Sequence, residues 1–205
     1  IGKAFIIGEK FIGNDSVALI LGDNIFYGYD FSSLLSKPIK SKKLGAHIFG
    51  YEVSDPQRFG VIEFSKDGKV KSLQEKPTNP KSNYAAVGLY IYDNDVIEIA
   101  KSVKPSPRGE LEITDINKVY LKKGKLYVTT MKDGFAWLDT GTHSSMLEAS
   151  QFVSTVERRQ GIKVGCIEEV AYKNHWISKK DLLALSKTYG ATEYADYLVK
   201  LKNKI

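Results

Sequence analysis

The chain has 205 residues, of which 42% are hydrophobic and 26% are charged, and its net charge is +6. These values are typical of a folded globular protein and exclude a disordered or fibrous one. The densest basic group, Lys37, Lys40, Lys42 and Lys43, is predicted to lie on a solvated loop. Because no aromatic residues alternate with these lysines, the pattern argues against nucleic-acid binding.

Cysteine content predicts a reducing compartment, and hydropathy argues against a membrane span. Cys166 is the single cysteine, so no intramolecular disulfide and no cysteine metal cluster can form. Because no apolar run approaches the roughly 20 residues that a membrane span needs, no membrane partner is expected. We therefore expect a cytoplasmic protein.

Hydrophobic periodicity predicts an α/β domain over residues 1–142 followed by a helical region over 143–205. In chain order, the expected elements are a helix at 3–12, a strand buried on both faces at 17–21, a helix at 31–35, a strand at 47–53, two strands at 60–65 and 69–76, a strand at 84–93, a helix to about 102, a helix from 113 that stops at 124, strands at 126–131 and 135–139, and helices at 145–161, 178–188 and 192–202.

Two local signals refine these boundaries. Asp67-Gly68 lies between two of the expected strands and predicts a hairpin with a type I′ turn, which needs positive φ at both central positions. Ser145 and Glu148 have the spacing of a capping box, so the long helix that follows is expected to begin at Ser145.

Two apolar strands end on a carboxylate. The run at 17–21 is followed by Gly22 and Asp23, and the run at 135–138 leads directly into Asp139. Ligands of α/β sheets bind beyond the carboxyl ends of the strands, so on neighbouring strands of one sheet the two aspartates would meet at a crevice. A carboxylate pair suits Mg²⁺. The alternative is turn chemistry for Asp23 and a capping or turn role for Asp139.

Three more charged residues are candidates for recognition of an anionic substrate. Glu75 and Lys76 follow each other near a strand end, and Arg108 lies in a Pro-rich loop before a helix, where an arginine can meet a phosphate. Adjacent residues of a strand point to opposite faces, so Glu75 and Lys76 can share one site only if the strand ends there. The alternative is that all three are ordinary exposed charges.

Six segments, taken in order, resemble one known family. They are LGDNIFYG, RFGVIEF, the EKP that closes the hairpin, NYAAVGLYIYDN, RGELEITDIN and WLDTGT. Together they resemble the glucose-1-phosphate thymidylyltransferases, which are sugar-nucleotide pyrophosphorylases. The resemblance implies a Rossmann-like nucleotidyltransferase fold with a mixed sheet and a helical C-terminal cap. It also implies a homotetramer that uses Mg²⁺ to make dTDP-glucose and pyrophosphate from dTTP and glucose 1-phosphate.

The resemblance also assigns roles to particular residues. Asp23 and Asp139 match the family's Mg²⁺-binding aspartates, and Asp23 also borders the nucleotide. Lys76 and Arg108 match the catalytic cations that hold the sugar phosphate. The residues that match the substrate pocket are Phe59 (where Tyr is common), Gly60, Glu75, Lys76, Ala86, Tyr90 and Trp137. Among them, Glu75 matches the carboxylate that binds sugar hydroxyls.

One family feature has no counterpart in this sequence. The family opens with a Gly-rich loop, GGxGTRLxPxT, that cradles the nucleotide, whereas this sequence has no such motif and opens on the helix predicted over 3–12. We therefore expect an N-terminally truncated fold whose missing part lies on a longer chain or on another chain. The alternative functions are an inactive sugar-phosphate-binding fragment and a pyrophosphorylase that uses UTP or CTP. A third alternative is a metal-dependent glycosyltransferase, although the six-segment match argues against it.

Overall fold

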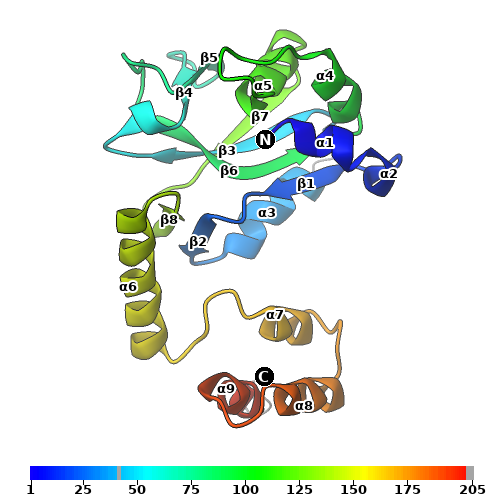
Figure 1. The fold of residues 1–205 in the computed structure, drawn as a ribbon, viewed down its shortest axis with the longest axis vertical. Helices are drawn as coiled ribbons and strands as arrows, with labels where there is room; N and C mark the ends of the chain where they lie inside the picture. Colours follow the sequence, from blue (N-terminus) through cyan, green and yellow to red (C-terminus); the bar gives the residue numbers. More distant parts are fainter. Residues whose placement is uncertain (41–42, 202–205) are drawn as a thin grey trace. The chain divides into compact units, whose positions relative to one another are not determined.

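A computed structural model describes residues 1–40 and 43–201 (Figure 1). Two compact units emerge, Ile1–Asp139 and Thr140–Ile205, and each is described by itself. All the strands in the described part of the chain belong to the first unit. None of the helices described is long and apolar enough to cross a membrane.

The first unit is built on a six-stranded mixed sheet. Strands β3 and β7 are parallel, and the remaining strand pairs of this sheet are antiparallel. The sheet order is β5 (Val70–Glu75), β4 (Gly60–Phe64), β6 (Tyr84–Tyr92), β3 (Ala46–Glu52) and β7 (Leu126–Thr130), and β1 (Val17–Ile20) also pairs with β6. This is the mixed α/β architecture that the sequence predicts.

Two strands share one edge of β6. Because β3 pairs along most of the other edge, β1 and β4 take successive parts of the free edge. Strand β1 pairs with Leu89–Tyr92, and β4 pairs with Ala85 and Ala86. Between these pairings the sheet opens at Val87 and Gly88, and the chain leaves β1 there to form a separate two-stranded ribbon, β2 (Asn24–Gly28) with β8 (Phe135–Asp139). Most of the predicted site residues lie around this opening.

Apolar side chains cover both faces of the main sheet. One cluster contains Phe5, Ile48, Ile62, Tyr92 and Ile116, so the face it covers carries α1 (Lys3–Ile7), α4 (Val96–Ser102) and α5 (Ile113–Lys122). A second cluster joins the opposite face to α3 (Phe31–Lys40) and to the β2–β8 ribbon.

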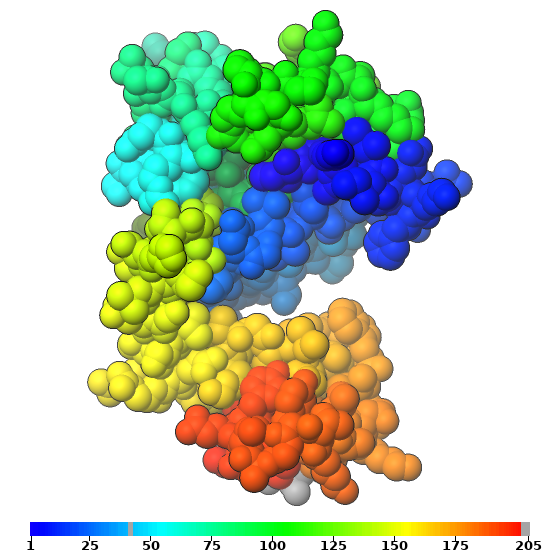
Figure 2. Space-filling view, in the orientation of Figure 1, coloured from blue at the N-terminus to red at the C-terminus, as the bar shows by residue number. Residues whose placement is uncertain are grey.

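The N-terminal segment forms two short helices. Helix α1 is followed at Gly8 by α2 (Glu9–Ile12), so the single helix predicted over 3–12 is wrong in its continuity. Phe5 anchors α1 by an edge-on contact with Tyr92, with the ring centroids 5.2 Å apart. In the space-filling view the blue N-terminal residues lie against the green α4 region (Figure 2).

Strand β1 is less buried than the sequence predicts. Its residues alternate between half-buried and exposed, and Ile20 is 58% exposed, so the strand is not covered on both faces as predicted. Strands β1 and β8 also belong to different sheets, so the condition under which the sequence predicts a shared crevice, two neighbouring strands of one sheet, is not met. A continuous apolar run therefore does not by itself establish a doubly buried strand.

The predicted hairpin forms, but its turn differs from the predicted one. Strands β4 and β5 are antiparallel neighbours, and the Gly68 N–H donates to the Ser65 carbonyl across 2.9 Å. Only Gly68 has positive φ, at 78°, and Asp67 does not. The connection is therefore longer than the two-residue type I′ turn, as in hairpins where a turn is followed by one left-handed glycine.

Two other boundaries differ from prediction. Helix α6 (His143–Gln160) begins earlier than expected, because Thr142 caps it and pairs reciprocally with Ser145 in the capping box. Lys37 and Lys40 lie in α3 and not on a loop, whereas Lys42 falls outside the described residues. Residue 202 of the last predicted helix also falls outside them.

The second unit contains α6, α7 (Ile167–Lys173), α8 (Lys179–Thr188) and α9 (Glu193–Leu201), of which α7 was not predicted. Its centre holds a buried carboxylate: Glu168 accepts hydrogen bonds from Tyr189 and Tyr194, each at 2.5 Å. Burial alone raises the pKa of Glu168, but these hydrogen bonds outweigh it and the net pKa is lowered. Because the folded pKa lies below the unfolded one, this stabilisation is present above about pH 4.5 and is lost as the pH falls further.

Replacing Tyr194 by Phe is expected to destabilise this unit at pH 7 by about 1–3 kcal/mol, because Glu168 loses one donor in a buried setting. Hydrogen exchange at the α9 amides measures the effect, which should shrink at pH 4. Tyr29→Phe is the matched control, because it removes the same hydroxyl from a residue that is 93% exposed. Equal exchange in both variants would contradict the role given to this hydrogen bond.

Candidate functional site

The β2–β8 ribbon brings the two predicted metal-binding aspartates to one end. Asp139 ends β8 and is the register partner of Asn24, and Asp23 directly precedes Asn24. The two carboxylates therefore come from adjacent positions at one end of the ribbon, although β1 and β8 are not neighbouring strands of one sheet. Asp23 is exposed and Asp139 is half-buried.

Asn24 is the hydrogen-bonding centre of this end of the ribbon. Its side-chain oxygen accepts from Trp137 Nε1 at 2.7 Å and from the Gly88 N–H at 3.0 Å. Its side-chain nitrogen donates to Asp23 Oδ1 at 2.7 Å. One amide thus fixes a predicted metal ligand and a predicted pocket residue to the opening along β6.

An aromatic group extends from the ribbon toward β4. The rings of Phe59 and Trp137 meet edge-on with centroids 4.9 Å apart, and Tyr51 contacts Trp137 at 6.0 Å. The guanidinium of Arg58 lies over the Phe59 ring, 5.2 Å from its centroid. The backbone carbonyl of Phe59 also accepts a hydrogen bond from the Lys76 N–H at 3.0 Å. Phe59 therefore connects the aspartate end of the site with the Lys76 end.

Glu75, Lys76 and Arg108 line one cleft of about 520 Å³. Strand β5 ends at Glu75, and Lys76 has a left-handed φ of 41°. The strand geometry that would place these two side chains on opposite faces therefore stops between them. The cleft is lined by Gln74, Glu75, Lys76, Pro77, Ser106, Pro107, Arg108, Glu112, Asp115 and Lys118.

Helix α5 fixes the Glu75 carboxylate through one hydrogen bond. The hydroxyl of Thr114, which is buried, donates to Glu75 Oε2 at 2.5 Å. Gly60 is the register partner of both Glu75 and Ala86, and a Cβ at Gly60 would lie 3.0 Å from Thr114 Oγ1. Burial, and then the Glu75 charge, raise the pKa of Tyr90 above its usual range, so the phenol stays protonated.

Arg108 lies among carboxylates at the rim of the cleft. Its Nη2 is 3.3 Å from Glu112 Oε1 and 3.2 Å from Glu110 Oε2. Glu112 is buried and also accepts a hydrogen bond from Ser106 at 2.9 Å. The charge of Glu112, followed by that of Glu110, raises the pKa of Arg108, so this guanidinium is permanently charged. A cation in this position suits a phosphate ligand.

The predicted residues thus fall into two connected groups. One contains Asp23, Asp139 and Trp137, and the other contains Gly60, Glu75, Lys76, Ala86, Tyr90 and Arg108, with Phe59 between them. Sequence reasoning missed Asn24, Arg58 and Thr114. All three lie inside the quoted segments, and Asn24 and Arg58 directly adjoin predicted residues, but nothing in the local pattern distinguishes a supporting side chain from a neighbour.

The carboxylate pair fits a magnesium ion. Mg²⁺ is usually held by one or two protein carboxylates together with waters and substrate phosphates, and Asp23 and Asp139 supply two such carboxylates. Residues 1–40 and 43–201 contain no group of three or more His, Cys, Asp or Glu side chains that could hold a metal ion.

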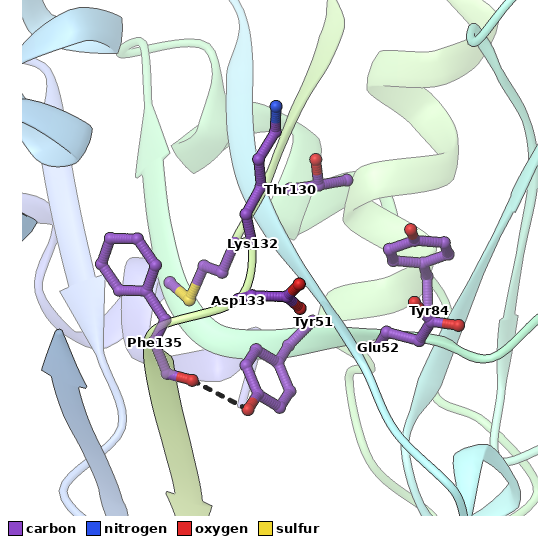
Figure 3. Close-up of a pocket in the computed structure, with 8 residues that line it drawn as sticks. Tyr51, Glu52, Tyr84, Thr130, Lys132, Asp133 and Phe135 are labelled. Atoms are coloured by element: carbon purple, nitrogen blue, oxygen red, sulfur yellow. Dashed lines mark hydrogen bonds between the residues drawn. The ribbon is translucent and has the colours of Figure 1, made fainter.

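A second cavity, of about 300 Å³, lies elsewhere in the same unit (Figure 3). It is lined by Tyr51, Glu52, Tyr84, Thr130, Met131, Lys132, Asp133 and Phe135, none of which is a predicted site residue. The Tyr51 hydroxyl donates to the Phe135 carbonyl at 3.0 Å and closes one side, as the dashed line shows (Figure 3). Tyr51 therefore borders this cavity and also contacts Trp137 of the candidate site.

Open α/β sheets bind ligands in a crevice beyond the carboxyl ends of their strands, and the opening here lies beyond the carboxyl end of β1. Comparison with known proteins specifies the class. The family profile of the nucleotidyl transferases matches residues 1–156. Glucose-1-phosphate thymidylyltransferase from Neisseria meningitidis serogroup A is 50% identical over 204 residues, which are 100% of this chain and 70% of the relative. The enzyme of that name from Mycobacterium tuberculosis H37Rv is 52% identical over 201 residues, 98% of this chain and 69% of the relative.

Two solved structures that match this chain have the same class of function. A UDP-glucose pyrophosphorylase complexed with UDP-glucose matches with a TM-score of 0.67 at 28% identity, covering 76% of this chain and 62% of that one. A Bacillus anthracis protein described as a glucose-1-phosphate thymidylyltransferase, in complex with a sucrose, matches with a TM-score of 0.66 at 43% identity, covering 74% and 60%. The chain belongs to the nucleotidyl transferase family and, within it, to the glucose-1-phosphate thymidylyltransferases.

Removing the Thr114 hydroxyl is expected to weaken sugar-phosphate binding about tenfold, because Glu75 loses a buried hydrogen bond that fixes its carboxylate. Thr114→Val keeps the side-chain shape, and Thr114→Ser keeps the hydroxyl and should restore most of the affinity. Calorimetric titration with glucose 1-phosphate measures both. If the Val and Ser variants bind equally, the hydrogen bond does not position Glu75 for the sugar.

Proposed function

We propose that this protein transfers a thymidylyl group from dTTP to glucose 1-phosphate, giving dTDP-glucose and pyrophosphate. The proposal depends chiefly on one observation: the chain is 50–52% identical, over nearly its whole length, to enzymes with that name. It spans about 70% of the length of the Neisseria relative. The arrangement of charges in the candidate site supports the same reaction.

The sugar phosphate would occupy the cleft that Glu75, Lys76 and Arg108 line. Lys76 and Arg108 would hold and orient the attacking phosphate, the arginine through two parallel hydrogen bonds. Glu75 would accept hydrogen bonds from sugar hydroxyls, where a missing partner in a buried site is costly. The remaining pocket residues carried over from the family are Phe59, Gly60, Ala86, Tyr90 and Trp137.

In the reaction, a phosphate oxygen of glucose 1-phosphate attacks the α-phosphorus of dTTP in line and pyrophosphate leaves, without a covalent enzyme intermediate. Catalysis then consists mainly of positioning and charge neutralisation. Asp23 and Asp139 would hold Mg²⁺, with Asp23 also bordering the nucleotide, and the ion would stabilise the charge that develops on the α-phosphate.

Pyrophosphate release from dTTP and glucose 1-phosphate with Mg²⁺ tests the proposal. The assay compares this chain with the Mycobacterium tuberculosis relative as the positive control, and UTP and CTP replace dTTP in parallel. Release that prefers dTTP supports the proposal, whereas release that prefers UTP would favour a uridylyltransferase, the activity suggested by the structural match to UDP-glucose pyrophosphorylase. If only the control releases pyrophosphate while this chain binds glucose 1-phosphate, the chain is a sugar-phosphate-binding module.

We also propose that the protein is cytoplasmic, that it assembles as a homotetramer, and that residues 1–142 and 143–205 act as the nucleotidyltransferase part and a C-terminal helical region. Light scattering coupled to size-exclusion chromatography tests the assembly. A monomer at micromolar concentration would contradict it.

A further inference from the structure

Arg58 is a basic residue of the site for which the resemblance gives no role. It ends a short 3₁₀ helix, Pro56–Arg58, directly before Phe59. Its Nη2 is 3.6 Å from Asp139 Oδ2, and its Nη1 is 2.9 Å from Asp55 Oδ2. One guanidinium is therefore shared between a proposed metal ligand and a second carboxylate outside the proposed metal site.

The two contacts of Arg58 differ in strength. The Asp55 contact has hydrogen-bond length, whereas the Asp139 contact at 3.6 Å is mainly electrostatic. The Asp139 side chain is 22% exposed and that of Arg58 is 43% exposed, so water screens their attraction only in part. Asp55 can thus retain the guanidinium when the Asp139 carboxylate turns toward another cation.

Stacking on Phe59 limits where the guanidinium can go. Arg58 lies over the Phe59 ring, and that ring also contacts Trp137 edge-on, two residues before Asp139. The aromatic face attracts the guanidinium and restricts its motion. Because the side chain is already restricted, it loses less conformational entropy when it contacts the carboxylate. The arrangement is preorganised to place one positive charge beside Asp139.

We propose that Arg58 is a positioning residue that holds the Asp139 carboxylate and competes with the divalent cation for it. The inference rests on the proposed function, because it requires a cation on Asp23 and Asp139. Arg58 would keep Asp139 neutralised and correctly placed before the cation arrives, and it would weaken cation binding to the free protein. The cation would then bind tightly only when substrate phosphates supply further oxygen ligands.

Binding of Mn²⁺, a cation with the same preference for oxygen ligands, to the full chain without nucleotide tests this competition by electron paramagnetic resonance. Arg58→Gln should tighten Mn²⁺ binding about two- to fivefold, the size expected from a partly exposed ion pair. Arg58→Lys should fall between Arg58→Gln and the unaltered protein. Arg158→Gln removes the same charge at an exposed position of α6 and should change nothing.

A second test uses a variant that should weaken Mn²⁺ binding. It keeps the proposal testable even if Arg58→Gln does not fold. Asp55→Asn frees Arg58 for Asp139, so Mn²⁺ should bind more weakly than in Asp95→Asn, which removes an equal charge elsewhere. In the Arg58→Gln background, Asp55→Asn should lose most of its effect. Additive effects would overturn the competition.

Asp139→Asn separates this inference from the proposed metal site. If Asp139→Asn leaves Mn²⁺ binding unchanged, the proposed metal site is wrong and the role of Arg58 falls with it. If Asp139→Asn weakens binding but Arg58→Gln weakens it or leaves it unchanged, the metal site stands and the competition is refuted. Weaker Mn²⁺ binding in Asp139→Asn together with tighter binding in Arg58→Gln supports both the metal site and the competition.

Discussion

Replacing Asp139 by Asn is expected to lower the rate of pyrophosphate release about 10³-fold while leaving the fold intact. The amide keeps the shape of the carboxylate and its place opposite Asn24 at the end of β8. It loses the charge that would bind the cation and, through it, stabilise the developing charge on the phosphate. Asp23→Asn should have the same effect, because Asp23 is the other carboxylate of the pair.

The control for this prediction is Asp95→Asn, which removes an equal charge where Asp95 contacts Lys125 at 3.7 Å. Circular dichroism and the thermal midpoint should be unchanged in all three variants. Residual activity within tenfold of the unaltered protein for either site variant would mean that the carboxylate pair does not bind the catalytic cation.

Adding one methyl group at Gly88 is expected to be the most damaging small substitution at the site. An alanine Cβ there would lie 2.5 Å from Asn24 Oδ1 and 2.9 Å from Leu21 Cδ1. Asn24 would have to move, and the Gly88 N–H and Trp137 Nε1 would lose their shared acceptor. We expect Gly88→Ala to lower the free energy of unfolding by about 2–4 kcal/mol, combining overpacking with a lost hydrogen bond.

Urea unfolding measures the loss of stability, and the fluorescence of Trp137 reports on the site when the exposed Trp176 is replaced by Phe. Gly50→Ala on the neighbouring strand β3 is the control, because the nearest atom to its Cβ would be Ile62 Cδ1 at 3.3 Å. Its cost should stay below about 1 kcal/mol, since that side-chain tip can yield. Similar costs in both variants would show that Asn24 tolerates displacement.

The sequence predicted most of the helices and strands, because their apolar spacing is clear. Strand β8 has the bounds that were predicted, and β6 differs from prediction by one residue. Errors appear where neighbours outside the window decide the outcome. The burial of Ile20 depends on what packs on β1, and the start of α6 depends on reciprocal hydrogen bonds of Thr142 rather than on the Ser145–Glu148 spacing.

For the candidate site, the structure brings the residues that the sequence predicts into two connected groups, but the sequence did not reveal which side chains support them. That Lys76 and Glu75 line one cleft depends on a left-handed φ at a non-glycine residue, which no local pattern reveals. The contact between Thr114 and Glu75 joins residues 39 positions apart. Such contacts are set by tertiary packing, so only the folded structure identifies Thr114, Asn24 and Arg58.

The buried Cys166 gives the helical unit an intrinsic reporter. Its Sγ lies 3.2 Å from the Tyr194 hydroxyl and 3.8 Å from Glu168 Oε2, and the residue is 3% exposed. Since the chain has no other thiol, the rate at which an aromatic disulfide reagent modifies the protein measures how often this unit opens to solvent. Ligands and substitutions elsewhere in the chain can then be ranked, without any added label, by whether they slow or speed that opening.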